Sequence, residues 1–206
     1  MKVGIIDTGN CSIRSLEYAF KKLGVTTGVV SSNDSPMDFD RFVLPGVGSF
    51  DFAVESIIRR NLWDLIRHLG LIEKKPILGI CLGMQLFADS SEEGDRSGLG
   101  LIKGKVLKIR PDNEIIYKVP NAGWSHIVPT ASPFTDSYPP TRQSPRFYFV
   151  HSYHLVCEDQ ADIAMLIQLD KSYCAAVISG NIWGAQFHPE KSHNFGLEFL
   201  RIWLES

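Results

Sequence analysis

A cysteine at position 81 stands between two glycines, at the end of a stretch that has the pattern of an apolar strand. Residues 76–80 lead into Cys81, and the pattern of residues 82–88 predicts a helix directly after it. Gly79 and Gly83 are the small neighbours that a sharp strand-to-helix turn needs to expose a nucleophile. The N–H groups and positive dipole end of such a helix would favour the reactive thiolate. A buried, inert cysteine is the alternative for this stretch alone.

The far end of the chain supplies a base and an acid in a second short pattern. His188 follows the apolar stretch 182–187, and Glu190 comes next but one, after Pro189. A cysteine nucleophile needs a base, and the base needs a third group that holds its tautomer. Cys81, His188 and Glu190 are therefore the predicted catalytic residues, with Glu190 orienting the imidazole of His188.

A glycine-rich turn and one glutamine complete the chemistry expected from the residues. Gly46 and Gly48 flank Val47 at the end of an apolar segment, and such a backbone can present N–H groups at close range. A plain tight turn is the alternative. Beside a cysteine nucleophile, we expect the N–H groups of Val47 and Leu82 to stabilise an oxyanion. Gln85 follows Cys81 by one helical turn and could reach the substrate.

These motifs resemble those of the class I (triad) glutamine amidotransferases. The resemblance rests on residues 80–85 (Ile-Cys-Leu-Gly-Met-Gln) and 186–190 (Gln-Phe-His-Pro-Glu). Residues 44–48 (Leu-Pro-Gly-Val-Gly) and 148–153 (Tyr-Phe-Val-His-Ser-Tyr) resemble the glutaminase subunit of imidazole glycerol phosphate synthase. The similarity extends over nearly the whole chain.

The resemblance implies hydrolysis of glutamine to glutamate and ammonia. Cys81 would attack the amide carbon, and His188 would protonate the leaving ammonia and then activate water against the thioester. The loop glycines Gly46 and Gly48 would contact the substrate. The resemblance also implies that the backbone around His151-Ser152-Tyr153 helps to hold glutamine; a plain core strand is the alternative there. No cofactor and no metal are expected.

The resemblance further implies a protein partner. Ammonia would pass through a channel in a (β/α)8-barrel synthase subunit, which would form a heterodimer with this chain and make imidazole glycerol phosphate in histidine biosynthesis. The acceptor would be a ribulosyl-linked aminoimidazole carboxamide nucleotide. Lys191 matches a basic position that contacts the barrel, and Trp124 lies in a segment near the glutamine site or the partner face.

Three other functions stay open from the sequence. Asn121, Ala122 and Ser125 stand in a segment that usually has the sequence Pro-His-Met-Gly-Trp-Asn in the family, so a related amidotransferase of surface-polysaccharide sugar amidation is one alternative. A stand-alone cysteine hydrolase on the same scaffold is another, although Gln85 favours an amidotransferase. A non-catalytic binding subunit is the third, and the intact Cys81 argues against it.

Composition and charge limit the class of protein. The 206 residues fit one domain, taken as residues 1–206, that is large enough for a good core. The net charge of −2 gives no reason to expect nucleic-acid binding. No apolar stretch approaches the ~20 residues of a membrane span. The chain start lacks the pattern of a signal peptide and the four cysteines are scattered, so we expect a cytoplasmic protein with reduced thiols.

Strand-like and helix-like segments alternate in the first half, which predicts a parallel α/β sheet with its site at the carboxyl ends of the strands. Later strand-like segments follow one another with few helices. We therefore expect a class I glutamine amidotransferase-like α/β fold: a central, mostly parallel sheet with helices on both faces plus an antiparallel extension. The predicted strands are 3–7, 25–30, 42–44, 76–80, 101–109, 115–119, 146–155, 163–169, 174–177 and 182–187, and the predicted helices are 13–23, 51–68, 82–88 and 197–204, with a surface loop at 90–98.

Overall fold

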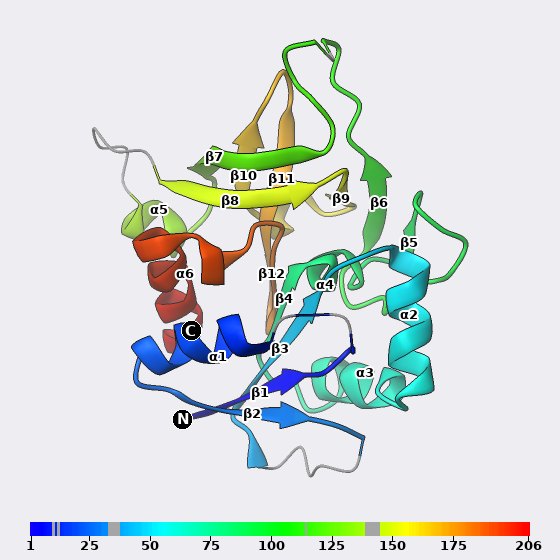
Figure 1. Ribbon diagram of the computed structural model, residues 1–206, viewed down its shortest axis with the longest axis vertical. Helices are drawn as coiled ribbons and strands as arrows, with labels where there is room; N and C mark the ends of the chain where they lie inside the picture. The colour runs from blue at the N-terminus through cyan, green and yellow to red at the C-terminus, as the bar shows by residue number, and fades with distance from the viewer. Residues whose placement is uncertain (10, 12, 33–37, 114, 139–144) are drawn as a thin grey trace.

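The computed structural model describes residues 1–9, 11, 13–32, 38–113, 115–138 and 145–206, which form two sheets and their flanking helices (Figure 1). The strands are β1 Lys2–Ile6, β2 Thr26–Val30, β3 Arg41–Gly46, β4 Ile77–Cys81, β5 Ser90–Ser91, β6 Gly104–Lys108, β7 Asn121–Pro129, β8 Arg146–His151, β9 Tyr153–Cys157, β10 Ile163–Gln168, β11 Ser172–Ser179 and β12 Ile182–Ala185. The helices are α1 Ile13–Lys22, α2 Phe50–Arg59, α3 Trp63–Leu71, α4 Leu82–Gln85, α5 Phe134–Ser137 and α6 His193–Glu205, with short 3₁₀ turns η2 Gln160–Asp162 and η3 Pro189–Lys191.

The larger sheet has nine strands in the order β2-β1-β3-β4-β12-β11-β10-β7-β8. Its first five strands run parallel to one another. From β12 onward each strand runs antiparallel to its neighbour. The prediction of a mostly parallel core with an antiparallel extension is therefore confirmed. The smaller sheet has the order β5-β6-β9.

Helices cover both faces of the parallel strands, with α1 and α6 on one side and α2 and α3 on the other (Figure 1). Successive residues of a strand point to opposite faces, and β3 follows this rule. Phe42 and Leu44 pack in the buried cluster that includes α2 and α3, whereas Val43 packs in the cluster with α1 and α6. No helix in the described residues is long and apolar enough to cross a membrane.

Aromatic side chains join the antiparallel strands to α6. The rings of Phe147 on β8 and Phe187 lie 4.1 Å apart, and the ring of Phe199 on α6 lies 5.0 Å from that of Phe187. All three side chains are fully buried. Because Phe187 directly precedes His188, this packing fixes the point at which the chain enters the second predicted catalytic motif.

The prediction of one helix over residues 51–68 is wrong, because the chain forms α2 and α3 with a break between them. Asn61 has φ +56°, a left-handed conformation that asparagine tolerates better than most residues. Leu62 is nevertheless buried in the same cluster as Ile57 and Ile66. The apolar spacing therefore continues across the break, so the sequence pattern does not indicate where the first helix ends.

The predicted strand over residues 115–119 is also wrong. Ile115 and Ile116 are 89% and 67% exposed, and their backbone N–H groups both donate to Oδ1 of Asn113, at 3.2 and 3.1 Å. A short polar side chain offers the backbone an alternative to strand pairing in this way. The two isoleucines suggested burial, but the local hydrogen bonds make a turn.

Strand β7 was not predicted, and the single strand predicted over 146–155 is divided into two. Asn121, Ala122 and Gly123 are weak strand formers, but pairing with β8 holds them extended, with Asn121 opposite His151. At Ser152 the chain leaves the large sheet, and β9 joins the small one beside β6. The closing helix α6 begins at His193, earlier than predicted.

Candidate active site

Strand β4 ends at Cys81 in a sharp turn. Cys81 has φ 55° and ψ −112°, outside the conformations that most residues adopt, and α4 follows at once. A Cβ built on Gly83 would lie 1.8 Å from the carbonyl oxygen of Leu44, and one on Gly79 would lie 2.5 Å from the ring of Phe87. Both positions therefore require glycine. Helix α4 is shorter than the predicted 82–88 and ends at Gln85.

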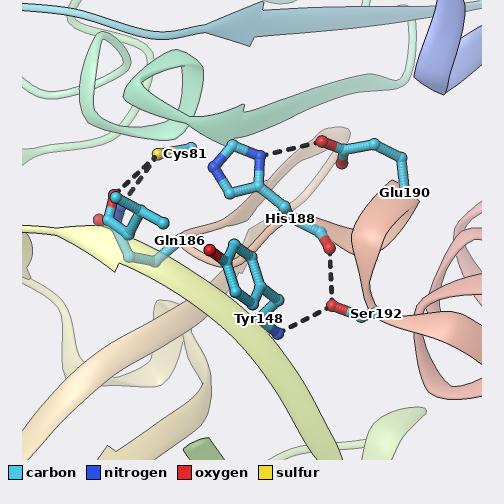
Figure 2. A network of polar contacts seen from close by, with 7 residues as sticks. Cys81, Tyr148, Gln186, His188, Glu190 and Ser192 are labelled. Carbon is cyan, nitrogen blue, oxygen red and sulfur yellow. Dashed lines mark hydrogen bonds and ion pairs between the residues drawn. The ribbon is translucent and has the colours of Figure 1, made fainter. Parts of the chain in front are cut away.

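His188 and Glu190 meet Cys81 from the segment that follows the neighbouring strand β12. The Nδ1 atom of His188 lies 3.0 Å from Oε1 of Glu190, and both side chains are 7% exposed. The Cys81 side chain lies beside the His188 ring (Figure 2). The structure thus brings the three predicted catalytic residues together in the order nucleophile, imidazole and carboxylate.

The backbone of His188 is fixed by β8 and by one hydroxyl (Figure 2). The His188 N–H donates to the carbonyl of Tyr148 at 2.9 Å. The hydroxyl of Ser192 donates to the carbonyl of His188 at 2.6 Å and accepts from the N–H of Tyr148 at 3.0 Å. Ser192 is fully buried, so this bridge is shielded from water. It was not expected from the sequence.

The surroundings of His188 favour its charged form. Burial lowers its pKa, but hydrogen bonds with Cys81 and Glu190 and the charges of both partners raise it, and the result is a pKa of about 9. At neutral pH the imidazole therefore carries a proton next to the sulfur. An imidazolium in this place can donate a proton to a leaving group.

A row of amides leads from the sulfur into the protein. Gln186 Nε2 lies 3.8 Å from Sγ of Cys81 (Figure 2). Gln85 Nε2 donates to Oε1 of Gln186 at 2.9 Å and to the carbonyl of Tyr153 at 3.1 Å. Gln85 is 4% exposed. Its amide N–H groups are therefore used to hold Gln186 and the start of β9.

His151 is neutral, in contrast to His188. Burial lowers its pKa to about 4. Nδ1 lies 2.8 Å from the carbonyl of Tyr153, and Nε2 lies 3.1 Å from Nδ2 of Asn121. A neutral ring with its proton on Nδ1 satisfies both contacts, because a carbonyl only accepts and the Asn121 amide nitrogen only donates.

An open cavity of about 350 Å³ lies over Cys81, within the range of small-molecule sites. Its walls come from the elbow, the loop after β3, the junction between β8 and β9, and the segment that follows β12. The lining residues are Val47, Gly48, Cys81, Leu82, Gln85, Glu93, Pro120, Val150, His151, Ser152, Tyr153, His188 and Lys191.

Comparison with known proteins identifies the family of this chain. The sequence model of the family "Glutamine amidotransferase class-I" matches residues 4–203. The chain belongs to the class-I glutamine amidotransferase family. Imidazole glycerol phosphate synthase subunit HisH 2 of Methanococcus maripaludis is 36% identical over 204 residues, which are 98% of each chain. Subunit HisH of Zymomonas mobilis is 42% identical over 210 residues, covering 98% of this chain and 95% of its own.

Solved structures show the same fold at lower sequence identity. A crystal structure described as glutamine amidotransferase aligns with a TM-score of 0.74 at 16% identity, covering 98% of this chain and 97% of the other. The PurLQS structure from Thermotoga maritima aligns with a TM-score of 0.72 at 19% identity, covering 99% and 97%. These neighbours confirm the class-I amidotransferase fold predicted from the sequence.

The other predicted site residues of this amidotransferase lie in the cavity wall, beneath the cavity or in a neighbouring groove. Val47, Gly48 and Leu82 line the cavity, whereas Gly46 lies beneath it, where an added Cβ would come within 2.9 Å of the Gly83 nitrogen. Lys191 is exposed at the cavity wall. Trp124 lies in a neighbouring groove, where its ring stacks on that of His193 with centroids 5.1 Å apart.

Besides Ser192, sequence reasoning missed two polar residues at the site. Glu93 was assigned to a surface loop, but it is half-buried, lines the cavity and accepts the N–H of Phe50 at 2.9 Å. Burial raises the pKa of its carboxyl group. Gln186 stood inside a quoted motif without a role. The sequence signal available for Gln186 was that it is a polar residue directly before the aromatic residue that ends the predicted strand. No such signal was available for Glu93.

The pKa of His188 gives the first testable prediction. A ¹H–¹³C NMR titration should show His188 losing its proton near pH 9. The Cys81→Ala variant should titrate at lower pH, because the hydrogen bond that raises the pKa is removed while burial remains. Protonated His188 contributes stability that is fully present below about pH 6.5 and is lost as the pH rises through about 9.

His151 gives a second imidazole signal in this titration, since burial lowers its pKa to about 4. A His188 midpoint below about 6.5 in the unmodified protein would show that the imidazole is neutral at physiological pH.

Proposed function

We propose that this chain is the glutaminase subunit of an imidazole glycerol phosphate synthase. The observation that carries the proposal is the Cys81–His188–Glu190 constellation, of which Cys81 and His188 line an amino-acid-sized cavity, in a chain 36% to 42% identical to proteins named as HisH subunits. It would hydrolyse glutamine and pass the ammonia to the other synthase subunit. The names of the relatives favour this acceptor over sugar amidation.

The charged state of His188 suits the first half of the reaction. Cys81 attacks the amide carbon of glutamine, and the oxyanion is held by the backbone N–H groups of Val47 and Leu82. One such donor typically contributes about 10²–10³ in rate. The His188 imidazolium gives its proton to the departing nitrogen, so ammonia leaves and a thioester with Cys81 remains.

The second half reverses the role of His188. The imidazole, now neutral, removes a proton from water, and the hydroxide attacks the thioester carbonyl. Glutamate leaves, and the sulfur of Cys81 is restored beside the imidazolium. Glu190 keeps the ring oriented through the 3.0 Å contact at Nδ1 and stabilises its charged form throughout.

Replacing the nucleophile tests the proposal directly. Cys81→Ala should lower glutaminase turnover by about three orders of magnitude or more, because residues of a triad act as a unit. Synthesis by the assembled enzyme should continue when ammonium salt replaces glutamine, since the acceptor site lies on the other subunit. Cys11→Ala is the matched control and should keep its glutaminase activity. Substantial turnover by Cys81→Ala would remove the triad assignment.

The substrate's amino-acid end is the second point of the proposal. Glutamine carries an α-ammonium group, and Glu93 is the carboxylate that lines the cavity. We assign Glu93 to bind that ammonium. The hydrogen bond from Phe50 holds the carboxylate in place from behind.

Glu93→Gln should raise the KM for glutamine about 10- to 100-fold with a smaller change in kcat, because a hydrogen bond to a charged group contributes about 1.5–3 kcal/mol. The amide oxygen of the new side chain can still accept from Phe50. The matched control is Glu92→Gln, whose exposed carboxylate pairs with Arg110. Equal KM values for the two variants would place the ammonium elsewhere.

The face around Lys191 and Trp124 is proposed to contact the partner, expected to be a (β/α)8-barrel. The ammonium of Lys191 lies 5.9 Å from the ring centroid of Tyr148, and Trp124 meets the same ring edge-on at 6.0 Å. The two residues are thus joined through Tyr148 into one surface beside the cavity. Trp124 is 44% exposed, which leaves its ring available for burial by another protein.

Lys191→Ala should loosen the coupling between ammonia release and product formation in the assembled enzyme. A charge pair desolvated by docking is worth ~2–5 kcal/mol when one partner is removed, against ~0–1 kcal/mol for an exposed pair. The measurement compares ammonia released with product formed, and Lys103→Ala, at an exposed ion pair outside the cavity lining, is the control. An unchanged ratio together with unchanged subunit affinity would leave Lys191 as a solvated surface residue.

A further inference from the structure

Two cysteines meet between the two sheets, apart from the catalytic sulfur. Cys157 ends β9 in the small sheet, and Cys174 lies in β11 of the large one. Their thiols hydrogen-bond to each other. The sulfur of Cys174 also lies 3.7 Å from the carbonyl oxygen of Ala176. Both side chains belong to the same apolar cluster, and both cysteines are free.

A separate cavity gives access to this pair. It has a volume of about 320 Å³, and Cys157 and Cys174 both line it. Four polar side chains, those of Thr130, His154, Gln160 and Ser172, share the wall. The two cysteines are only 2% and 4% exposed, so a protein-sized oxidant cannot reach them, but a molecule about the size of water can enter the cavity.

The two sulfur atoms differ in acidity. The hydrogen bond from Cys174 lowers the pKa of the Cys157 thiol, against the effect of burial. The same hydrogen bond, together with burial, raises the pKa of the Cys174 thiol well above its ordinary value. Since the thiolate is the nucleophile, Cys157 is the sulfur that reacts first and Cys174 the one that follows.

We propose that Cys157 and Cys174 form a reversible dithiol–disulfide site that small peroxides oxidise. The Cys157 thiolate attacks one oxygen of hydrogen peroxide; the O–O bond breaks, hydroxide leaves and takes up a proton, and a sulfenic acid remains. The Cys174 sulfur then attacks the Cys157 sulfur, the S–O bond breaks and a second water leaves. Two thiols and one peroxide thus give one disulfide and two waters, and a thiol reductant reverses the change.

The place of this bond gives it a structural effect. It would tie β9 to β11, two strands that belong to different sheets. Strand β9 begins at Tyr153, whose carbonyl receives the hydrogen bonds of Gln85 and His151 at the glutamine cavity. The oxidised protein should therefore unfold at a higher temperature than the reduced one, since the crosslink restrains the unfolded chain.

The test uses the full chain with Cys11→Ser and Cys81→Ala, which leaves the pair as its remaining cysteines. Hydrogen peroxide is the probe, followed by alkylation of free thiols and peptide mass spectrometry. The expected result is loss of both free thiols, a linked pair of peptides containing Cys157 and Cys174, a raised Tm, and full reversal by dithiothreitol. This measurement needs no substitution at the pair itself, so it does not depend on variants that pack less well.

Two variants then separate the roles of the sulfurs. Adding Cys174→Ser should stop the reaction at a Cys157 sulfenic acid, which dimedone traps. Adding Cys157→Ser should leave Cys174 open to alkylation after the same treatment. The proposal is overturned if both thiols of the folded protein stay free under peroxide that oxidises free cysteine, or if the linkage appears only after denaturation. Trapping at Cys174 in place of Cys157 would overturn the order of the two steps.

Discussion

The backbone at Cys81 is held in a conformation that a strand running into a helix would not adopt by itself. Its φ of 55° is maintained because β3 and β4 pair in register up to Gly46 and Cys81, and because the Leu44 carbonyl sits against Gly83. The same close contact brings the loop that carries Val47 alongside the sulfur. One tight packing of two strands therefore points the predicted nucleophile into the cavity and places the expected oxyanion loop beside it.

Two histidines of the same cavity illustrate how surroundings set charge. Both are buried, and burial alone pushes a histidine pKa downward. His151 has a carbonyl and an amide for neighbours and stays neutral, with a pKa of about 4, whereas His188 has a thiol and a carboxylate and reaches about 9. The carboxylate of Glu190 and the sulfur of Cys81 thus account for the difference in pKa between the two histidines. The neutral ring of His151 is suited to a structural role.

The sequence predicted those parts of the site whose residues lie close together in short, local motifs. The elbow around Cys81 and the His188–Glu190 pair each occupy a few adjacent residues, and the strand alternation gave the core of the fold. Glu93 and Ser192 were missed because their roles come from chain segments far away in sequence. The break at Asn61 was hidden because apolar spacing runs through it, and β7 depends on its pairing with β8.

The parallel pairing of β4 with β12 has a consequence for the making of the protein. Ile80 lies opposite Ala185, so the pairing of the strand that carries Cys81 is completed only when a strand from the far end of the chain docks beside it. Contacts between such distant segments form slowly, because a long loop must be closed first. On the ribosome, Cys81 is translated well before His188. While the chain is still being made, the Cys81 thiol therefore has no histidine beside it. The site is assembled only in the final stage of folding.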